Sequence, residues 1–131
     1  MSPMISIIDD DESVREATRG LIRSMGFNAT AFASSEDFLQ SSQLDDTSCV
    51  ITDVQMPGLS GLELQSILKA RGHHKPIIFI TAFPEERIRT RVLEAGAVAF
   101  LSKPFNEECL INCLDAALSS HAGERAKKSP C

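Results

Sequence analysis

Four short apolar segments of this chain are each followed by a polar side chain that can bind a metal ion or an anion. These side chains are Asp9, Asp53, Thr81 and Lys103, and Asp10 follows directly on the first of them. Each segment is continuously apolar and rich in β-branched residues, which is typical of a strand buried on both faces of a parallel sheet. Because the carboxyl ends of parallel strands meet at one edge of a sheet, the pattern predicts one shared site. Acids bind a divalent cation, whereas a hydroxyl and an ammonium bind an anion, so the predicted ligands are Mg²⁺ and a phosphoryl group.

Strand-like and helix-like patterns alternate five times along the 131 residues, a length typical of one domain. The strands are expected at residues 4–8, 28–32, 49–52, 77–80 and 98–102. Right-handed crossovers between parallel strands would place helices on both faces of the sheet. The pattern therefore predicts an α/β fold, a doubly wound (βα)5 three-layer sandwich, and leaves the strand order open.

Several helix starts carry recognisable signals. Residues 13–16 and 60–63 each have the Ser-x-x-Glu spacing of a capping box. Pro84 is expected in the first turn of a helix, where its missing N–H costs nothing. Asn106 is expected to cap the last helix.

The composition excludes some classes of function. A net charge of −5 argues against broad electrostatic binding to nucleic acid by this segment. No apolar stretch approaches the ~20 residues that a transmembrane helix requires. The charges that begin at Asp9 argue against a secretory signal peptide. We therefore expect a cytoplasmic protein that does not contact the membrane.

The cysteines and the C-terminal residues complete the expectations from composition. The four cysteines show no metal-site spacing, so we expect free thiols, with a redox-linked dimer through Cys131 as the alternative. After about Ser120 the sequence turns polar. We expect one domain over residues 1–120, followed at 121–131 by a polar tail or the start of a linker.

Asp53 is the candidate nucleophile of the predicted site. A carboxylate can attack a phosphoryl group and form an aspartyl phosphate. Mg²⁺ and the mobile ammonium of Lys103 would neutralise the phosphoryl oxygens, and Thr81 would hydrogen-bond one of them. Converging acids repel, so without a cation the pKa of at least one should be raised. Each of these residues also has an ordinary interpretation: the acids as a solvated run of charges, Thr81 as a strand residue and Lys103 as a surface lysine. Only their occurrence together at the ends of strands favours a shared site.

Four motifs at these positions resemble the receiver domains of two-component response regulators. They are residues 7–15, which contain the run DDDESVR, and residues 53–61, 80–82 and 103–105. The resemblance covers residues 4–120, and its first two motifs look most like receivers that precede LuxR-type helix-turn-helix output domains. It implies a flavodoxin-like fold with strand order 2-1-3-4-5.

The resemblance also implies roles for the acids. Asp53 would accept a phosphoryl group from the phosphohistidine of a sensor histidine kinase or a phosphotransfer protein. Mg²⁺ would bind Asp10 directly, Asp9 largely through water, Asp53, and the backbone carbonyl of Gln55. Asp11 would be a loop charge beside them.

The resemblance further implies that Thr81 and Lys103 hold the phosphoryl group. Lys103 would be followed by a cis peptide bond to Pro104, although from sequence alone a trans proline is the commoner case. Such a bond would turn the chain sharply and aim the amine back over the site.

A family switch couples Thr81 to the aromatic residue three before the lysine, which is Phe100 here. Phosphorylation would draw Thr81 toward the phosphate and let Phe100 turn inward; the alternative is that Phe100 is simply a core residue. The switch would alter the face formed by residues 84–96, 98–101 and 106–119. That face would then control homodimerisation or contact with a partner or output domain.

Two other classes of protein are alternatives to a signalling domain. A Mg²⁺-dependent phosphatase or phosphotransferase usually has a second acid two residues after its nucleophile, where this chain has Gln55. A flavodoxin-like electron carrier needs a glycine- and hydroxyl-rich phosphate loop after its first strand, where residues 9–12 are acidic. We therefore expect no enzyme, only intrinsic self-phosphorylation and autodephosphorylation.

Two expectations concern lifetime and output. Gln55 and Phe83 occupy positions where the family tunes the lifetime of the phosphoryl group, and the bulky Phe83 predicts a long one. The chain is expected to be either a stand-alone receiver or part of a transcription factor whose DNA-binding domain is missing from this segment.

Overall fold

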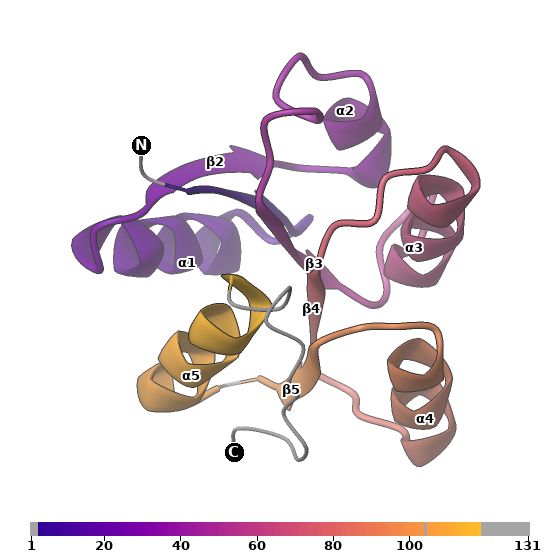
Figure 1. Ribbon diagram of the computed structural model, residues 1–131. Helices are drawn as coiled ribbons and strands as arrows, with labels where there is room; N and C mark the ends of the chain where they lie inside the picture. The colour runs from indigo at the N-terminus through magenta and orange to yellow at the C-terminus, as the bar shows by residue number, and fades with distance from the viewer. Residues whose placement is uncertain (1–2, 104, 119–131) are drawn as a thin grey trace.

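The computed structural model describes residues 3–103 and 105–118, in which five strands alternate with five helices (Figure 1). The strands are β1 (Met4–Ile8), β2 (Asn28–Phe32), β3 (Cys49–Asp53), β4 (Ile77–Thr81) and β5 (Ala99–Ser102). The helices are α1 (Glu12–Ser24), α2 (Ser35–Leu39), α3 (Gly61–Ala70), α4 (Glu86–Glu94) and α5 (Glu107–Leu118). The predicted (βα)5 pattern is confirmed.

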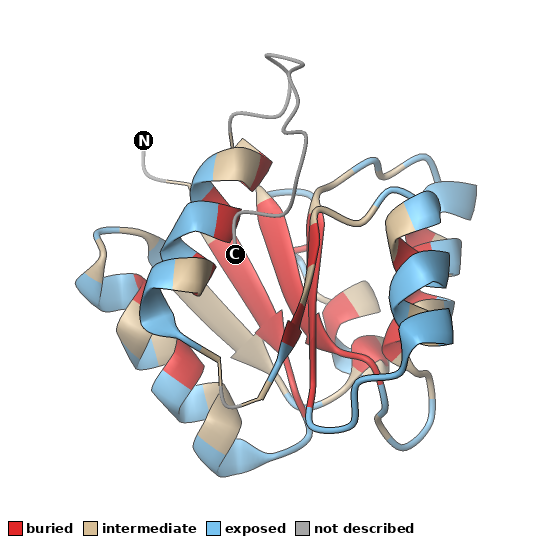
Figure 2. Ribbon diagram, turned by 90° about the horizontal axis from the view of Figure 1, so that it is seen from below, coloured by how far each residue is buried: buried red, intermediate tan, exposed pale blue. Residues whose placement is uncertain are grey.

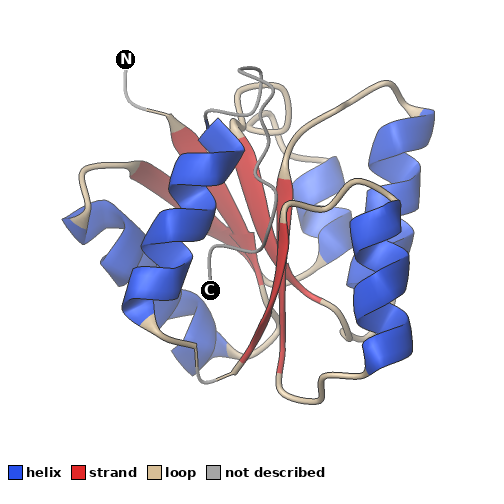
Figure 3. Ribbon diagram, turned by 60° about the horizontal axis from the view of Figure 1, so that its bottom comes forward, coloured by secondary structure: helices blue, strands red, loops and turns tan. Residues whose placement is uncertain are grey.

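All five strands are parallel and lie in the order β2-β1-β3-β4-β5. This is the order that the family resemblance implied. Helices α1 and α5 cover one face of the sheet, whereas α2, α3 and α4 cover the other (Figures 1 and 3). From β1 the chain first adds β2 on one side and then β3 on the other, so the topological switch point of the sheet lies between β1 and β3. Open α/β folds bind ligands at the carboxyl ends of the strands beside this point.

The core consists of two apolar clusters separated by the sheet. The cluster under α1 and α5 includes Ile7, Ile51 and Leu114, and the cluster under the other three helices includes Phe38 and Phe79. Successive side chains of a strand point to opposite faces, so the continuously apolar strands β1, β3 and β4 supply both clusters. Figure 2 shows these central strands buried and the edge strand β2 only partly buried.

The helix starts confirm two predicted caps and contradict two. Ser60 and Glu63 form the predicted capping box, and the Asn106 carboxamide oxygen accepts from the N–H groups of residues 108 and 109. The predicted capping box at residues 13–16 is wrong, because α1 begins at residue 12 and its N-cap is Asp11. The prediction for Pro84 is also wrong, because α4 begins at Glu86 and the proline lies before the N-cap residue.

The cysteines agree only in part with the expectation of free thiols. Cys49 and Cys113 are free, and burial raises their pKa to about 12 and about 11. Cys109 is disulfide-bonded, so the prediction of a free thiol is wrong for it. Cys131 lies outside the described residues.

Two other predictions also concern residues outside the described part of the chain. These are the cis bond to Pro104 and the tail at residues 121–131. Among the helices of residues 3–103 and 105–118, none is long and apolar enough to cross a membrane.

Candidate metal and anion site

The sheet brings the four predicted side chains to one edge. Asp9 directly follows β1, Asp53 ends β3, Thr81 ends β4, and Lys103 directly follows the last residue of β5. The Lys103 N–H donates to the Thr81 carbonyl over 2.8 Å, which continues the β4–β5 ladder past the last strand pair. We call this edge, where the strands end, the carboxyl edge.

Lys103 lies between two carboxylates. Its Nζ is 3.0 Å from Asp9 Oδ2 and 2.8 Å from Asp53 Oδ2. The Lys103 side chain is 15% exposed, that of Asp9 0% and that of Asp53 12%. Such shielding strengthens the attraction relative to a surface pair.

Backbone N–H groups hold the other oxygen of each carboxylate. Asp9 Oδ1 accepts from the Asp11 N–H over 2.9 Å, and Asp53 Oδ1 accepts from the Gln55 N–H over 3.1 Å. Both carboxylates therefore have fixed orientations. Because Gln55 donates its N–H here, the position of the loop after β3 is coupled directly to the Asp53 side chain.

The charges at this edge shift two pKa values. Burial raises the pKa of the Asp9 carboxyl above 3.8; the Asp11 N–H and the Lys103 ammonium oppose this, and the charge of Asp53 reinforces it. The raised pKa predicted from sequence is thus found at Asp9, although burial contributes more than repulsion. Burial lowers the pKa of Lys103, but the hydrogen bonds and charges of Asp53 and Asp9 outweigh it and leave the pKa above 10.5.

Three carboxylates gather here in a way that suits a hard cation. Asp9, Asp10 and Asp53 each offer an oxygen, and these oxygens lie within 4.8 Å of one another. Asp10 is exposed, whereas the other two are buried. Mg²⁺ prefers oxygen ligands, keeps several waters and uses few carboxylates, so the donor set fits this ion.

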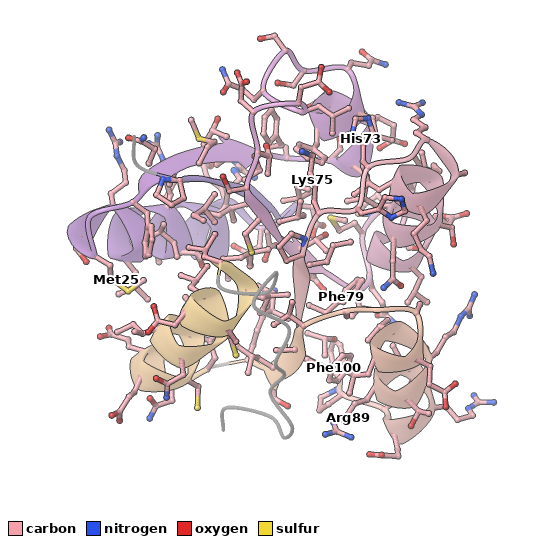
Figure 4. The ribbon with its side chains drawn as sticks, viewed as in Figure 1. Met25, His73, Lys75, Phe79, Arg89 and Phe100 are labelled. Carbon is pink, nitrogen blue, oxygen red and sulfur yellow. The ribbon has the colours of Figure 1, made fainter. Side chains whose placement is uncertain are left out.

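Thr81 and the two candidate aromatic residues, Phe83 and Phe100, differ in how far they are buried. Thr81 is buried, and its Oγ1 accepts from the Phe83 N–H over 3.1 Å. The Phe83 side chain is 72% exposed. Phe100 is partly buried and packs against the cluster of Phe79 and Val92, on the α4 side of the sheet (Figure 4).

The start of α3 packs directly against the backbone of Asp53. The Gly61 N–H donates to the Val54 carbonyl over 2.9 Å, and a Cβ at Gly61 would overlap the Asp53 carbonyl oxygen. Only glycine therefore allows α3 to begin so close to the end of β3.

Three residues that contribute to this region were not assigned these roles from the sequence. Arg15 Nη1 donates to the Asp9 carbonyl over 2.9 Å, which fixes the loop after β1 from the first turns of α1. Asp11 caps α1 with its side chain and holds Asp9 with its N–H. Glu36 of α2 accepts from the Leu59 N–H over 3.2 Å. The run of acids before α1 could have indicated the cap, whereas nothing near Glu36 in the sequence points to residue 59.

A parallel sheet in this order, with an acidic cluster and a lysine at its carboxyl edge, defines a doubly wound α/β domain with a site for a metal ion and an anion. Comparison with known families agrees. The model of the response regulator receiver domain matches residues 5–115, and the chain belongs to this family. It is thus a signalling domain of a two-component response regulator rather than a classical enzyme, and phosphorylation and Mg²⁺ binding are general properties of the family.

Relatives support this assignment. The chain is 42% identical over 114 residues to nodulation protein W of Bradyrhizobium diazoefficiens, covering 87% of this chain and 50% of that protein. It is 38% identical over 118 residues to the transcriptional regulatory protein FixJ of Azorhizobium caulinodans, covering 90% and 56%. The solved response regulator StyR superposes with a TM-score of 0.85 at 39% identity, covering 93% and 62%. The chain thus spans about half the length of the curated relatives it matches.

Proposed function

We propose that Asp53 is the phosphoacceptor of this receiver domain and that Mg²⁺ assists the transfer. The observation that carries the proposal is the contact of the Lys103 ammonium with Asp53 at 2.8 Å and with Asp9 at 3.0 Å. A carboxylate in this setting is oriented, nearly buried and next to a positive charge. These are the requirements for attack on a phosphoryl group.

The reaction would move one phosphoryl group. An Asp53 oxygen forms a bond to phosphorus as the P–N bond of a donor phosphohistidine breaks, and the leaving imidazole takes up a proton. With acetyl phosphate as donor a P–O bond breaks and acetate leaves, which is the self-phosphorylation expected of this domain. Attack by water on the phosphorus of the acyl phosphate then returns Asp53 and phosphate.

Each neighbouring group has a separate task in this proposal. Asp9, Asp10, Asp53 and the Gln55 carbonyl would hold Mg²⁺, which when bound neutralises phosphoryl oxygens. Lys103 stays an ammonium at neutral pH, since its pKa is raised, and would pair with a phosphoryl oxygen. The Thr81 hydroxyl would donate its hydrogen to another such oxygen, because its own oxygen already accepts from residue 83.

The test is intact-mass analysis after incubation with Mg²⁺ and acetyl phosphate, with Asp53→Asn as the comparison. The wild type should gain one base-labile phosphoryl adduct, and the variant should gain none. If Mg²⁺ binding is established and the wild type still gains no adduct, the donor would have to be a kinase phosphohistidine. If that donor also leaves the protein unmodified, Asp53 is not the acceptor.

A switch through Phe100 forms the output half of the proposal. Filling of the phosphoryl site would draw Thr81 inward and let the Phe100 ring turn from its partly buried position into the space vacated, with a gain of ~1.5–3 kcal/mol at most. The face of α4, β5 and α5 would then change and favour a homodimer or a partner. A Phe100→Ala protein with a normal phosphorylation-dependent dimer would contradict this switch.

Lifetime and domain organisation follow from the same assignment. Phe83 would limit the access of water to the phosphoryl group, so the aspartyl phosphate should be long-lived, and a half-life of seconds would contradict this.

The receiver would occupy residues 1–120 with a tail or linker over 121–131. A sensor histidine kinase or phosphotransfer protein in the cytoplasm would be the donor. A DNA-binding output domain in the rest of the protein is supported by relatives named as transcriptional regulators.

A further inference from the structure

A carboxylate from α2 reaches the loop that follows Asp53. Glu36 Oε2 accepts a hydrogen bond from the Leu59 N–H over 3.2 Å, although the two residues are 23 apart in sequence. Gly58 has a φ of +75°, and a Cβ at that position would lie 2.6 Å from the same oxygen. The Glu36 carboxylate therefore lies directly against the backbone of residues 58–59.

This loop is also fixed at its two ends. The Val54 N–H donates to the Ile80 carbonyl over 3.1 Å, and the Gly61 N–H donates to the Val54 carbonyl over 2.9 Å. Between these ends, the Gln55 N–H donates to Asp53 Oδ1. The contact with Glu36 holds the far part of the loop from a separate helix. A hydrogen bond to a charged carboxylate is stronger than one between neutral groups.

We propose that Glu36 is a positioning residue for the Asp53 site and acts through the backbone of residues 55–59. By fixing the loop at Leu59 it keeps the Gln55 N–H on Asp53 and keeps the Gln55 carbonyl in place for the metal ion. The proposal rests on the function proposed above, because it needs Mg²⁺ at Asp53. Residues that orient metal ligands in this way have measurable effects on metal affinity although they do not touch the ion.

The first experiment compares Glu36→Ala, Glu36→Gln and Asp37→Ala. The glutamine keeps an oxygen that can accept from Leu59, so it separates the hydrogen bond from the charge. Asp37 is the neighbour in the same first turn, so its replacement removes an equal charge near the same helix end. The readouts are the Mg²⁺ dissociation constant by calorimetry and the hydrogen-exchange rates of the amides at Gln55 and Leu59.

The alanine variant should bind Mg²⁺ about tenfold more weakly and exchange both amides faster. Because glutamine keeps an acceptor oxygen but not the charge, its variant should lie between the wild type and the alanine variant in Mg²⁺ affinity, and Asp37→Ala should match the wild type. Recovery of Mg²⁺ affinity in the glutamine variant would assign the loss in the alanine variant to the missing hydrogen bond at Leu59 rather than to a general loss of stability. Unchanged Mg²⁺ affinity in Glu36→Ala, or an equal loss in Asp37→Ala, would overturn the proposal.

A double-mutant cycle tests the contact itself. Gly58→Ala should lower the urea midpoint more than Gly72→Ala does, because Gly72 has a similar φ of +81° but an added Cβ there would meet nothing within 4 Å. In a Glu36→Ala background the effect of Gly58→Ala should fall to that of Gly72→Ala. Equal effects of Gly58→Ala in the wild-type and Glu36→Ala backgrounds would show that the Glu36 carboxylate does not contact the loop at residue 58.

The outcomes separate the two proposals. A wild-type protein that binds no Mg²⁺ and accepts no phosphoryl group would overturn the proposed function. In that case the amide exchange of Gln55 and the cycle still decide whether Glu36 holds the loop. Normal Mg²⁺ binding by the wild type with no effect of Glu36→Ala would overturn the role of Glu36 alone.

Discussion

Both edges of the sheet contain lysines whose ammonium groups bond to oxygens from other elements, and the oxygens differ in kind. At the carboxyl edge Lys103 bonds to the carboxylates of Asp9 and Asp53. At the opposite edge Lys75 Nζ donates to the Thr47 carbonyl over 2.9 Å, and Lys69 Nζ donates to the Ala95 carbonyl over 3.1 Å. Those two lysines help to line a cavity of about 240 Å³ that lies away from the acids.

The difference separates a structural contact from an exchangeable one. Lys69 and Lys75 bond to backbone carbonyls, which are fixed parts of the fold. These bonds connect the C-terminal end of α4 and the chain before β3 to the rest of the domain. Carboxylates are also ligands for metal ions, so under the proposed function Mg²⁺ would replace the Lys103 ammonium at these oxygens and the ammonium would then pair with a phosphoryl oxygen. The same residue type thus bonds to backbone carbonyls at one edge and to carboxylates at the other, and under the proposed function only the second kind of contact would take part in chemistry.

Replacement of Lys103 should have the largest effect. Lys103→Met leaves two nearly buried carboxylates without their cation, and the free energy of unfolding at pH 7 without Mg²⁺ should fall by about 3 kcal/mol. Excess Mg²⁺ should restore much of this loss, since it supplies positive charge at the same oxygens. The measurement is urea unfolding followed by circular dichroism, because the chain has no Trp or Tyr.

Lys69→Met is the control at the other edge. Its ammonium is exposed and bonds to one carbonyl, so the loss should not exceed about 0.5 kcal/mol and should not depend on Mg²⁺. Similar losses for the two lysines, or no effect of Mg²⁺ on Lys103→Met, would remove the distinction between the edges.

A smaller effect is expected for two cations that both bond to carbonyls. Arg15→Met and Lys75→Met should each cost about 1–2 kcal/mol, because each removes a charged hydrogen-bond donor from a partly buried carbonyl. Only Arg15→Met should also weaken Mg²⁺ binding, since the carbonyl it holds belongs to Asp9. Calorimetric titration of both variants checks this, and equal Mg²⁺ affinities would contradict it.

Among the variants at the carboxyl edge, the smallest expected effect concerns the charge of Asp9. Its pKa is raised in the folded protein, mainly by burial, so its contribution to stability is complete below pH 3.8 and is lost as the pH rises through the folded-state pKa. Asp9→Asn should therefore be more stable than the wild type at pH 7 without Mg²⁺, by on the order of 1 kcal/mol. The gain should disappear as the pH falls toward 3.8. A gain that persists unchanged in acid would show that the charge is not its cause.

The strands were predictable because their signal is local and strong. Residues such as Ile7, Ile51 and Ile78 lie in continuous apolar runs, and a strand buried on both faces needs such a run. The site residues at the strand ends followed from the same pattern. The strand order did not follow from it and entered only through the family resemblance.

The helix starts show where local signals compete. Ser60 is the N-cap of α3, and the capping box that it forms with Glu63 is the one the sequence predicts. Before α1, four acids precede Ser13, and Asp11 becomes the cap because its N–H is already held by Asp9, which fixes the chain at the start of the helix. Pro84 likewise signals a helix start but is two residues early.

By itself the sequence determined the five strands, the two-faced core and the convergence of Asp9, Asp53, Thr81 and Lys103 on one edge, because these depend on periodicity and on the shared direction of parallel strands. Only the tertiary structure decided how the side chains there are held. The bond from Arg15 to the Asp9 carbonyl and the contact of Glu36 with Leu59 join elements whose distance in space is not encoded by any local pattern. Such contacts arise when packing of the layers sets the position of one loop against another.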